Sequence, residues 1–80
     1  MEEIIAEYIA DRSEVEIKVE FSFESHDYLN CHFTDLTEDG YAIFEVNYMD
    51  PEDNSVSVSE IVVPLKLIVR IATVKSSTKL

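Results

Sequence analysis

Residues 55–75 constrain the fold more than any other stretch, because two β-rich segments are joined there across a single proline. Proline cannot donate a hydrogen bond to a sheet, so Pro64 is expected to end a strand over residues 55–63. Leu65–Leu67 then has the length of one 3₁₀ turn, and a second strand is expected over residues 68–74. Both strands carry apolar residues on more faces than one small core can bury. This surplus favours contact with another surface.

The N-terminal residues predict a helix over residues 2–11. Apolar side chains recur there at helical spacing, at Met1, Ile4, Ile5, Tyr8 and Ile9. Glu2 and Glu3 in the first turn are favourable near the positive end of the helix dipole. The polar face carries acids, whereas helices that lie on membrane surfaces carry Lys and Arg, so the sequence argues against a membrane partner.

Residues 14–24 alternate strictly between apolar and polar, which predicts a strand with one buried and one solvated face. The expected buried face carries Val15, Ile17, Val19, Phe21 and Phe23. Residues 24–27 then predict a turn. A second strand is expected over residues 28–36, with a bulge or the strand end near Asp35.

The only glycine of the chain, Gly40, follows Asp39, and this pair predicts a tight hairpin turn. A third strand is expected over residues 41–49. In the following strand the apolar residues change phase at Ser59 and Glu60, which predicts a bulge there. A bulge bends a strand sharply, and such bending curls a short sheet into a barrel.

One helix followed by five short strands predicts a mainly β fold, namely a strongly bent antiparallel barrel with the helix lying across it. A single domain is expected over residues 1–80, with the helix at 2–11, the barrel at about 14–75 and a loose tail at 76–80. A chain of 80 residues is near the lower size limit for a self-sufficient core. Burying surface against sister subunits would therefore add stability.

Charge is distributed unevenly along the chain, which carries 17 acids and 6 bases for a net charge of −11. Residues 1–60 hold all 17 acids and two bases, a balance of −15, whereas residues 61–80 hold four bases and no acid. Those four bases are Lys66, Arg70, Lys75 and Lys79. One interpretation is a solubilising acidic surface. The other is that the basic segment meets an acidic face of a neighbouring copy, or offers the one approach for a nucleic acid.

The sequence has no apolar run of about 18 residues, the length that a membrane-spanning helix needs. Its first residues, Met1, Glu2 and Glu3, are acidic where a secretory signal starts with basic residues. We therefore expect a cytoplasmic location.

No arrangement of residues predicts catalysis or a cofactor. The single cysteine, Cys31, lies in a strand-like pattern and is expected to be a small buried hydrophobe, since no His and Asp set is spaced to activate it. His26 and His32 would lie about 20 Å apart along a strand, too far to share one metal ion. The acids of residues 50–54 lack the spacing of a calcium-binding loop. We expect no enzyme and no metal site.

Two stretches resemble motifs of the Sm/LSm-like (Hfq-like) small β-barrel family. Residues 61–71, with sequence IVVPLKLIVRI, resemble its second motif of strand, short 3₁₀ step and strand. The first motif is matched more loosely by Phe33-Thr34-Asp35 and by Glu38-Asp39-Gly40. The chain thus looks like a divergent phage or metagenomic member. The resemblance implies an SH3-like barrel and a cyclic homo-oligomer of roughly five to seven subunits, in which the fourth strand of one subunit pairs with the fifth strand of the next.

The resemblance also implies sites. Family members bind single-stranded RNA at the pore of the ring, which carries over to Asp39, Gly40, Tyr41 and Lys66 in this chain. This chain has Asp39 where many members have Asn, and Leu65-Lys66 where many have Arg-Gly. The subunit interface would use Val58, Val62, Val69, Arg70 and Ile71.

Two functions are therefore open. The first is a ring-forming module that binds RNA or single-stranded DNA in its processing. The second is an acidic protein-interaction scaffold or adaptor, which a phage could encode and which binds no nucleic acid. The resemblance favours the first, and the net charge of −11 counts against it because it repels phosphate.

Overall fold

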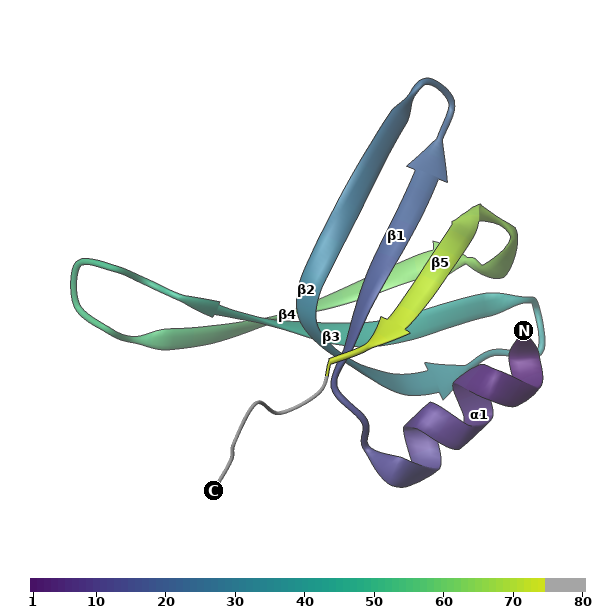
Figure 1. Ribbon diagram of the computed structural model, residues 1–80, viewed down its shortest axis with the longest axis horizontal. Coiled ribbons are helices and arrows are strands. Elements are labelled where there is room, and N and C mark those ends of the chain that lie inside the picture. Colours follow the sequence, from purple (N-terminus) through teal and green to yellow (C-terminus); the bar gives the residue numbers. More distant parts are fainter. Residues whose placement is uncertain (75–80) are drawn as a thin grey trace.

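The fold is mainly β, with one helix at the N-terminus (Figure 1). The structure is a computed structural model that describes residues 1–74. Its elements in chain order are α1 (Glu2–Asp11), β1 (Val15–Phe21), β2 (Glu24–Leu36), β3 (Tyr41–Met49), β4 (Val56–Pro64), the 3₁₀ turn η1 (Leu65–Leu67) and β5 (Ile68–Thr73). The predicted helix, third strand and 3₁₀ turn are confirmed. The predicted tail over residues 76–80, and with it Lys75 and Lys79, lies outside the described residues.

The five strands form one antiparallel sheet in the order β4-β3-β2-β1-β5. The sheet is open, so β4 and β5 are its two edges. These are the two strands that residues 55–75 were expected to supply. Because they follow one another in the chain and are joined only by η1, a single short stretch of sequence provides both edges.

Helix α1 packs its apolar stripe against β2 and closes one side of the core. Ile5 is fully buried, and the ring of Tyr8 stacks on that of Phe33 with centroids 6.5 Å apart. The helix ends at Arg12, whose positive φ of 55° turns the chain toward β1. The Arg12 and Ser13 N–H groups donate to carbonyls of the last helical turn, so the helix end is capped by its own backbone.

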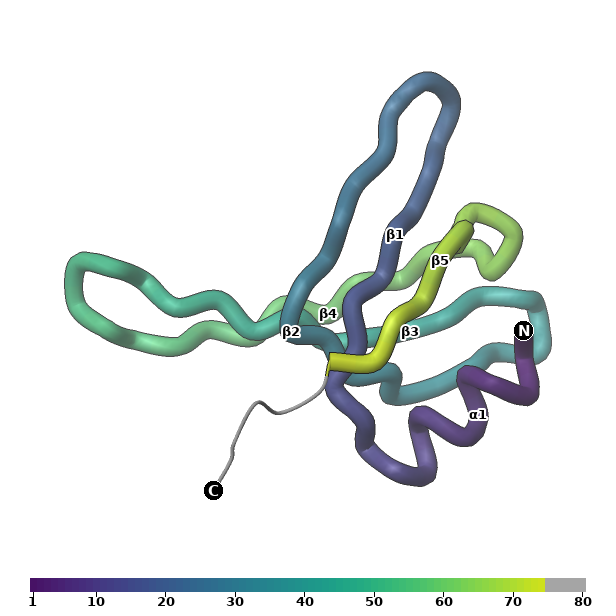
Figure 2. The backbone as a smooth tube through the Cα atoms, viewed as in Figure 1, coloured from purple at the N-terminus to yellow at the C-terminus, as the bar shows by residue number. Residues whose placement is uncertain are grey.

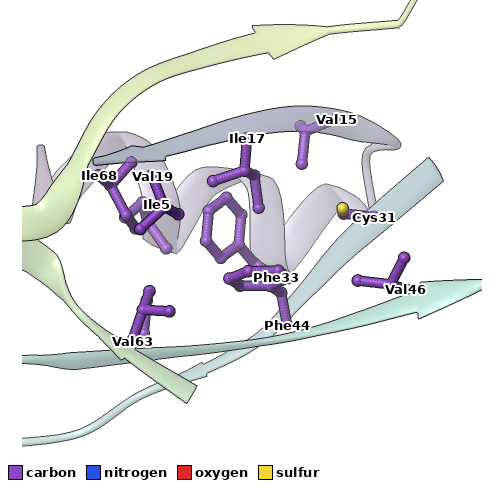
Figure 3. Packing of buried hydrophobic residues seen from close by; sticks show 11 residues of the cluster. Ile5, Val15, Ile17, Val19, Cys31, Phe33, Phe44, Val46, Val63 and Ile68 are labelled. Atoms are coloured by element: carbon purple, nitrogen blue, oxygen red, sulfur yellow. The ribbon is translucent and has the colours of Figure 1, made fainter. Parts of the chain in front are cut away.

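The core contains eleven buried residues from the helix and all five strands (Figure 3). They are Ile5, Val15, Ile17, Val19, Cys31, Phe33, Ala42, Phe44, Val46, Val63 and Ile68. Phe44 is fully buried and makes edge-to-face contacts with Phe33 at 5.8 Å and Tyr28 at 5.3 Å between ring centroids. Aromatic contacts of this geometry stabilise the core beyond the area they bury.

The hairpin between β1 and β2 turns earlier than predicted. Ser22 and Phe23 form the turn, with Ser22 at φ 59°, and Phe21 pairs with Glu24. The expected turn over residues 24–27 is wrong, because those residues pair with β1. The expected burial of Phe21 and Phe23 is also wrong: both are exposed, Phe23 fully. The alternation continues past the core, since the hairpin projects beyond it.

The bulges differ in part from those expected. The register shift between Phe33 and Asp35 confirms the irregularity predicted near Asp35. The bulge predicted at residues 59–60 is wrong, because β4 pairs with β3 without interruption along its whole length. A bulge that the sequence pattern did not predict lies at Leu29 and Asn30, where Asn30 has φ 59°.

Two hairpins extend from the core in different directions (Figure 2). We call residues 19–30 the β1–β2 arm and residues 46–59 the β3–β4 arm. The cause lies in the pairing of β2 with β3, which runs only from Leu36 opposite Ala42 to Cys31 opposite Val46. Beyond this last pair β2 pairs only with β1, and β3 pairs only with β4, so the two arms separate.

Candidate nucleic-acid loops and assembly edges

The two loops expected at the nucleic-acid site lie side by side. The Leu65 N–H donates a 2.9 Å hydrogen bond to the Gly40 carbonyl, and Tyr41 lies directly opposite Pro64. This contact joins the loop before β3 to η1, although the two are more than 20 residues apart in the sequence. The fold therefore brings Asp39, Gly40, Tyr41 and Lys66 to one end of the β3–β4 ladder.

The loop before β3 is held by its own hydrogen bonds. The Gly40 N–H donates to the Thr37 carbonyl at 3.2 Å, and the Tyr41 N–H donates to the Thr37 hydroxyl at 3.0 Å. Gly40 has φ 92°, a conformation that side chains rarely adopt, although a Cβ there would meet no atom within 4 Å. Glycine is thus required for backbone conformation and not for space.

The exposed groups of these loops fit contact with a nucleic acid. Tyr41, Asp39 and Lys66 are all exposed. A tyrosine ring can stack on a base, and an ammonium can bind a phosphate. The Asp39 carboxylate accepts hydrogen bonds and repels phosphate, so only a base edge suits it.

The free edge of β4 exposes a row of valines. The hydrogen bonds from Leu65 to Gly40 and from Asp50 to Ser55 continue the β3–β4 register and show which backbone groups face β3. The even-numbered residues of β4 therefore turn their N–H and C=O groups away from β3. These are Val56, Val58, Glu60 and Val62, whose side chains are all exposed, Val58 to 55% and Val62 to 53%.

Strand β5 offers a shorter edge. Val69 is 49% exposed and Arg70 is exposed, whereas Ile71 lies opposite Ile17 and packs against the core. Four of the five expected interface residues thus have accessible side chains, and Ile71 has mainly an internal role. A substitution at Ile71 would disturb folding together with any contact at this edge.

The two edges carry charges of opposite sign. Glu60 of β4 lies directly opposite Glu45 of β3, and Arg70 of β5 lies directly opposite Lys18 of β1. Like charges in directly opposed positions destabilise a sheet. The edge at β4 is therefore acidic and destabilised by the repulsion between Glu60 and Glu45. The edge at β5 is basic, and the repulsion between Arg70 and Lys18 is offset in part by Asp27, which lies opposite Lys18 on its other side.

Cys31 and His26 are the remaining candidates for a reactive or metal-binding role. Burial, with the charges of Glu14 and Glu16, raises the pKa of the Cys31 thiol from 9.0 to about 11, so it carries no thiolate near neutral pH. Its predicted role as a buried hydrophobe is confirmed. His26 lies 3.6 Å from Glu24. Within residues 1–74, no three His, Cys, Asp or Glu side chains are grouped to hold a metal ion, and no helix there is long and apolar enough to cross a membrane.

Sequence reasoning missed the region where the arms separate. A groove of about 370 Å³ lies there between β2 and β3, lined in part by Leu29, Tyr48 and Met49. The signal that could have revealed it was the absence of Lys and Arg from residues 19–30 and 46–59.

No protein-family model, curated protein or solved structure matches this chain. Its function is therefore inferred from its own geometry and charge.

Proposed function

We propose that this protein is an Sm-like module, with its sheet bent into a barrel, that assembles head to tail into a ring through β4 and β5 and binds single-stranded nucleic acid. The observation that carries the proposal is the presence of two open edges that are apolar and opposite in charge. Open edges with exposed valines pair readily with another chain, since their N–H and C=O groups need partners.

The charges favour pairing of unlike edges. Two β4 edges would bring two pairs of glutamates together, and two β5 edges would bring Lys18 and Arg70 against their own copies. An acidic β4 edge beside a basic β5 edge relieves both repulsions. Head-to-tail contacts close into a ring when the rotation from one subunit to the next is a whole-number fraction of a full turn.

Nucleic-acid binding would use the paired loops. Each subunit would contribute Tyr41 for stacking and Lys66 for phosphate, with Asp39 and Gly40 beside them. Stacking on an aromatic ring contributes about 1–3 kcal/mol per base, and a ring repeats the same weak site in every subunit. This repetition offsets the repulsion that a net charge of −11 per subunit exerts on phosphate.

Fluorescence anisotropy with short oligo(U) and oligo(A) tests the binding. We expect micromolar affinity that falls as salt is raised. Lys66→Gln should reduce the salt dependence, and Tyr41→Ala, which removes the ring from every subunit, should weaken binding about 5- to 150-fold for each base that stacks. Ile4→Ala, at an exposed apolar residue on the helix, serves as a control that should bind like the wild type. Absence of binding by a protein that still assembles would exclude nucleic acid and leave the assembly intact.

The second candidate is an acidic protein-interaction scaffold that binds no nucleic acid. It is favoured by the charge of the two arms, which carry acids and no Lys or Arg. The same anisotropy experiment separates the two candidates, because the scaffold would assemble without binding either oligonucleotide.

A further inference from the structure

The region where the two arms separate forms a fork with two open backbone edges. Its walls are residues 25–30 of β2 and residues 47–49 of β3, and its floor is Val46, opposite Cys31 in the last β2–β3 pair. Figure 2 shows the two hairpins diverging from this point. The groove between the walls, about 370 Å³, is a second place where this sheet is unpaired, distinct from the outer edges at β4 and β5.

Both walls turn backbone groups into the fork. On β3 the odd-numbered residues face away from β4. Val46 therefore forms a non-hydrogen-bonded pair with Cys31, so the ladder closes between Asn47 and Asn30, and Met49 is the first residue of β3 whose backbone groups toward β2 are open. On β2 the two-residue turn makes Phe21 and Glu24 the closing hydrogen-bonded pair, so Ser25 and Asp27 face away from β1. Beyond Asn30 and Asn47, neither wall has a strand partner on this side among the described residues.

The fork also offers apolar contacts. Leu29 on one wall and Tyr48 and Met49 on the other are exposed, and all three line the groove. The bulge at residues 29–30 turns Leu29 outward here instead of into the core. Single exposed apolar residues are common on protein surfaces, but three that line one groove form a surface for a partner.

Charge restricts what that partner can be. The two arms carry six carboxylates, on Glu20, Glu24, Asp27, Asp50, Glu52 and Asp53, and no Lys or Arg. Asp27 lines the groove itself and lies opposite Lys18 of β1, and the other five lie elsewhere on the arms. The Ser55 N–H donates a 2.9 Å hydrogen bond to Asp53, which lowers the pKa of that carboxyl and keeps it charged. A phosphate backbone is repelled from such a surface. A second copy would have to offer its basic β5 edge, which the proposed head-to-tail contact with β4 already uses.

We infer that the fork binds an extended, cationic segment of another protein, in which basic side chains alternate with apolar ones. The segment adds as a strand to the open edge of β2, and its backbone pairs with Ser25 and Asp27. Consecutive residues of β3 point to opposite faces, so side chains on one face of the segment reach Tyr48 and those on the other face reach Met49. Basic side chains of the segment face Asp27 and the other acids of the arms. Strand addition of this kind derives affinity from the backbone and specificity from alternate side chains. The fork is the surface that the scaffold candidate would use, and it involves neither the loops at Gly40 and Leu65 nor the outer edges.

The probe is a short peptide in which lysine alternates with valine, titrated into the full chain and followed by amide NMR shifts. We expect the largest shifts at Ser25, Asp27 and Met49, and slower hydrogen exchange at the Ser25 and Asp27 amides in the complex. Leu29→Lys and Met49→Lys, which remove an apolar contact and repel the lysines of the peptide, should each weaken binding at least tenfold. Ile4→Lys, which adds the same charge at an exposed apolar residue on the helix, should change the affinity less than twofold.

Three further arms keep the proposal falsifiable. Asp27→Asn, an isosteric change at an exposed residue, should weaken the lysine peptide. Because Asp27 lies opposite Lys18, urea denaturation of this variant measures any loss of stability separately. A peptide with glutamate in place of lysine should not bind, and a peptide with proline at alternate positions should lose the affinity that backbone pairing supplies. Equal binding of the proline peptide, equal weakening by Ile4→Lys, or shifts confined to residues outside the fork would each overturn the inference. Light scattering in which Leu29→Lys dissociates an assembly would show that a second copy fills the fork, and would overturn it too.

Discussion

Val62→Glu is the sharpest test of assembly, because the side chain of Val62 lies on the free edge of β4 and is 53% exposed. Burying a whole valine contributes about 1.5–3 kcal/mol, so covering its exposed half in a subunit contact contributes about 0.8–1.5 kcal/mol. A glutamate there loses this term and must also shed water beside Glu60, which costs about 1–3 kcal/mol more. The sum, about 1.8–4.5 kcal/mol per contact, corresponds to roughly 20- to 2,000-fold weaker association.

The folded subunit should tolerate this change. The side chain points to solvent, so the free energy of unfolding of the monomer should change by less than about 1 kcal/mol. Sedimentation velocity over a wide range of protein concentration measures the assembly, and urea denaturation measures the monomer. Val62→Thr keeps a β-branched side chain and should assemble more tightly than Val62→Glu, while Ile4→Glu on the helix should assemble like the wild type. A wild type that is monomeric at tens of micromolar, or a Val62→Glu variant that assembles normally, would refute the role of this edge.

Two further predictions use charge and pH. Glu60→Arg should weaken assembly about 3- to 10-fold, because it places cations at both edges. The same variant should raise the melting temperature of the monomer, because it relieves the repulsion from Glu45. Adding Arg70→Glu should restore assembly, and a double variant that assembles as weakly as the single one would contradict the pairing of unlike edges. The free energy of unfolding should fall by up to about 2–3 kcal/mol between pH 9 and 11, because the unfolded chain loses the Cys31 proton near pH 9.0 and the folded chain holds it to about 11. Urea denaturation of Cys31→Ala across the same range should lack this part of the slope, and parallel curves would show that Cys31 does not cause it.

Local signals predicted much of the fold. Apolar residues at helical spacing, with acids in the first turn, form a short-range pattern. This pattern predicted α1 with its observed bounds. Pro64 and Gly40 act on the backbone directly, so the end of β4, η1 and the turn before β3 followed from single residues. The juxtaposition of Tyr41 and Lys66 came from a resemblance and not from any local pattern, and the β3–β4 register is what brings them together.

The errors share a physical cause. Alternation of apolar and polar residues predicts one buried face. The hairpins extend beyond the core, however, and there Phe21 and Phe23 keep the alternation without being buried. The phase change in β4 arose in the same way, because Val56 and Val58 lie on the exposed face of an unbroken strand. Periodicity reports which residues share a face, but it does not report where the core ends. The apolar residues of these strands that lie beyond the core stay exposed and are available to contact partners.

The distribution of charge separates the two proposed ligands in space. Lys66 and Arg70 belong to η1 and β5, whereas the six acids of the arms lie on the two hairpins that form the fork, with Asp27 in its wall. A nucleic acid at Tyr41 and Lys66 and a cationic peptide at the fork would therefore occupy different surfaces. Saturating oligonucleotide should change the affinity of the protein for the peptide by less than about threefold. The concentration of free peptide is first corrected for peptide that binds the oligonucleotide directly. A larger loss of affinity would mean that the two ligands compete for one surface, and the assignment of separate sites would then be wrong.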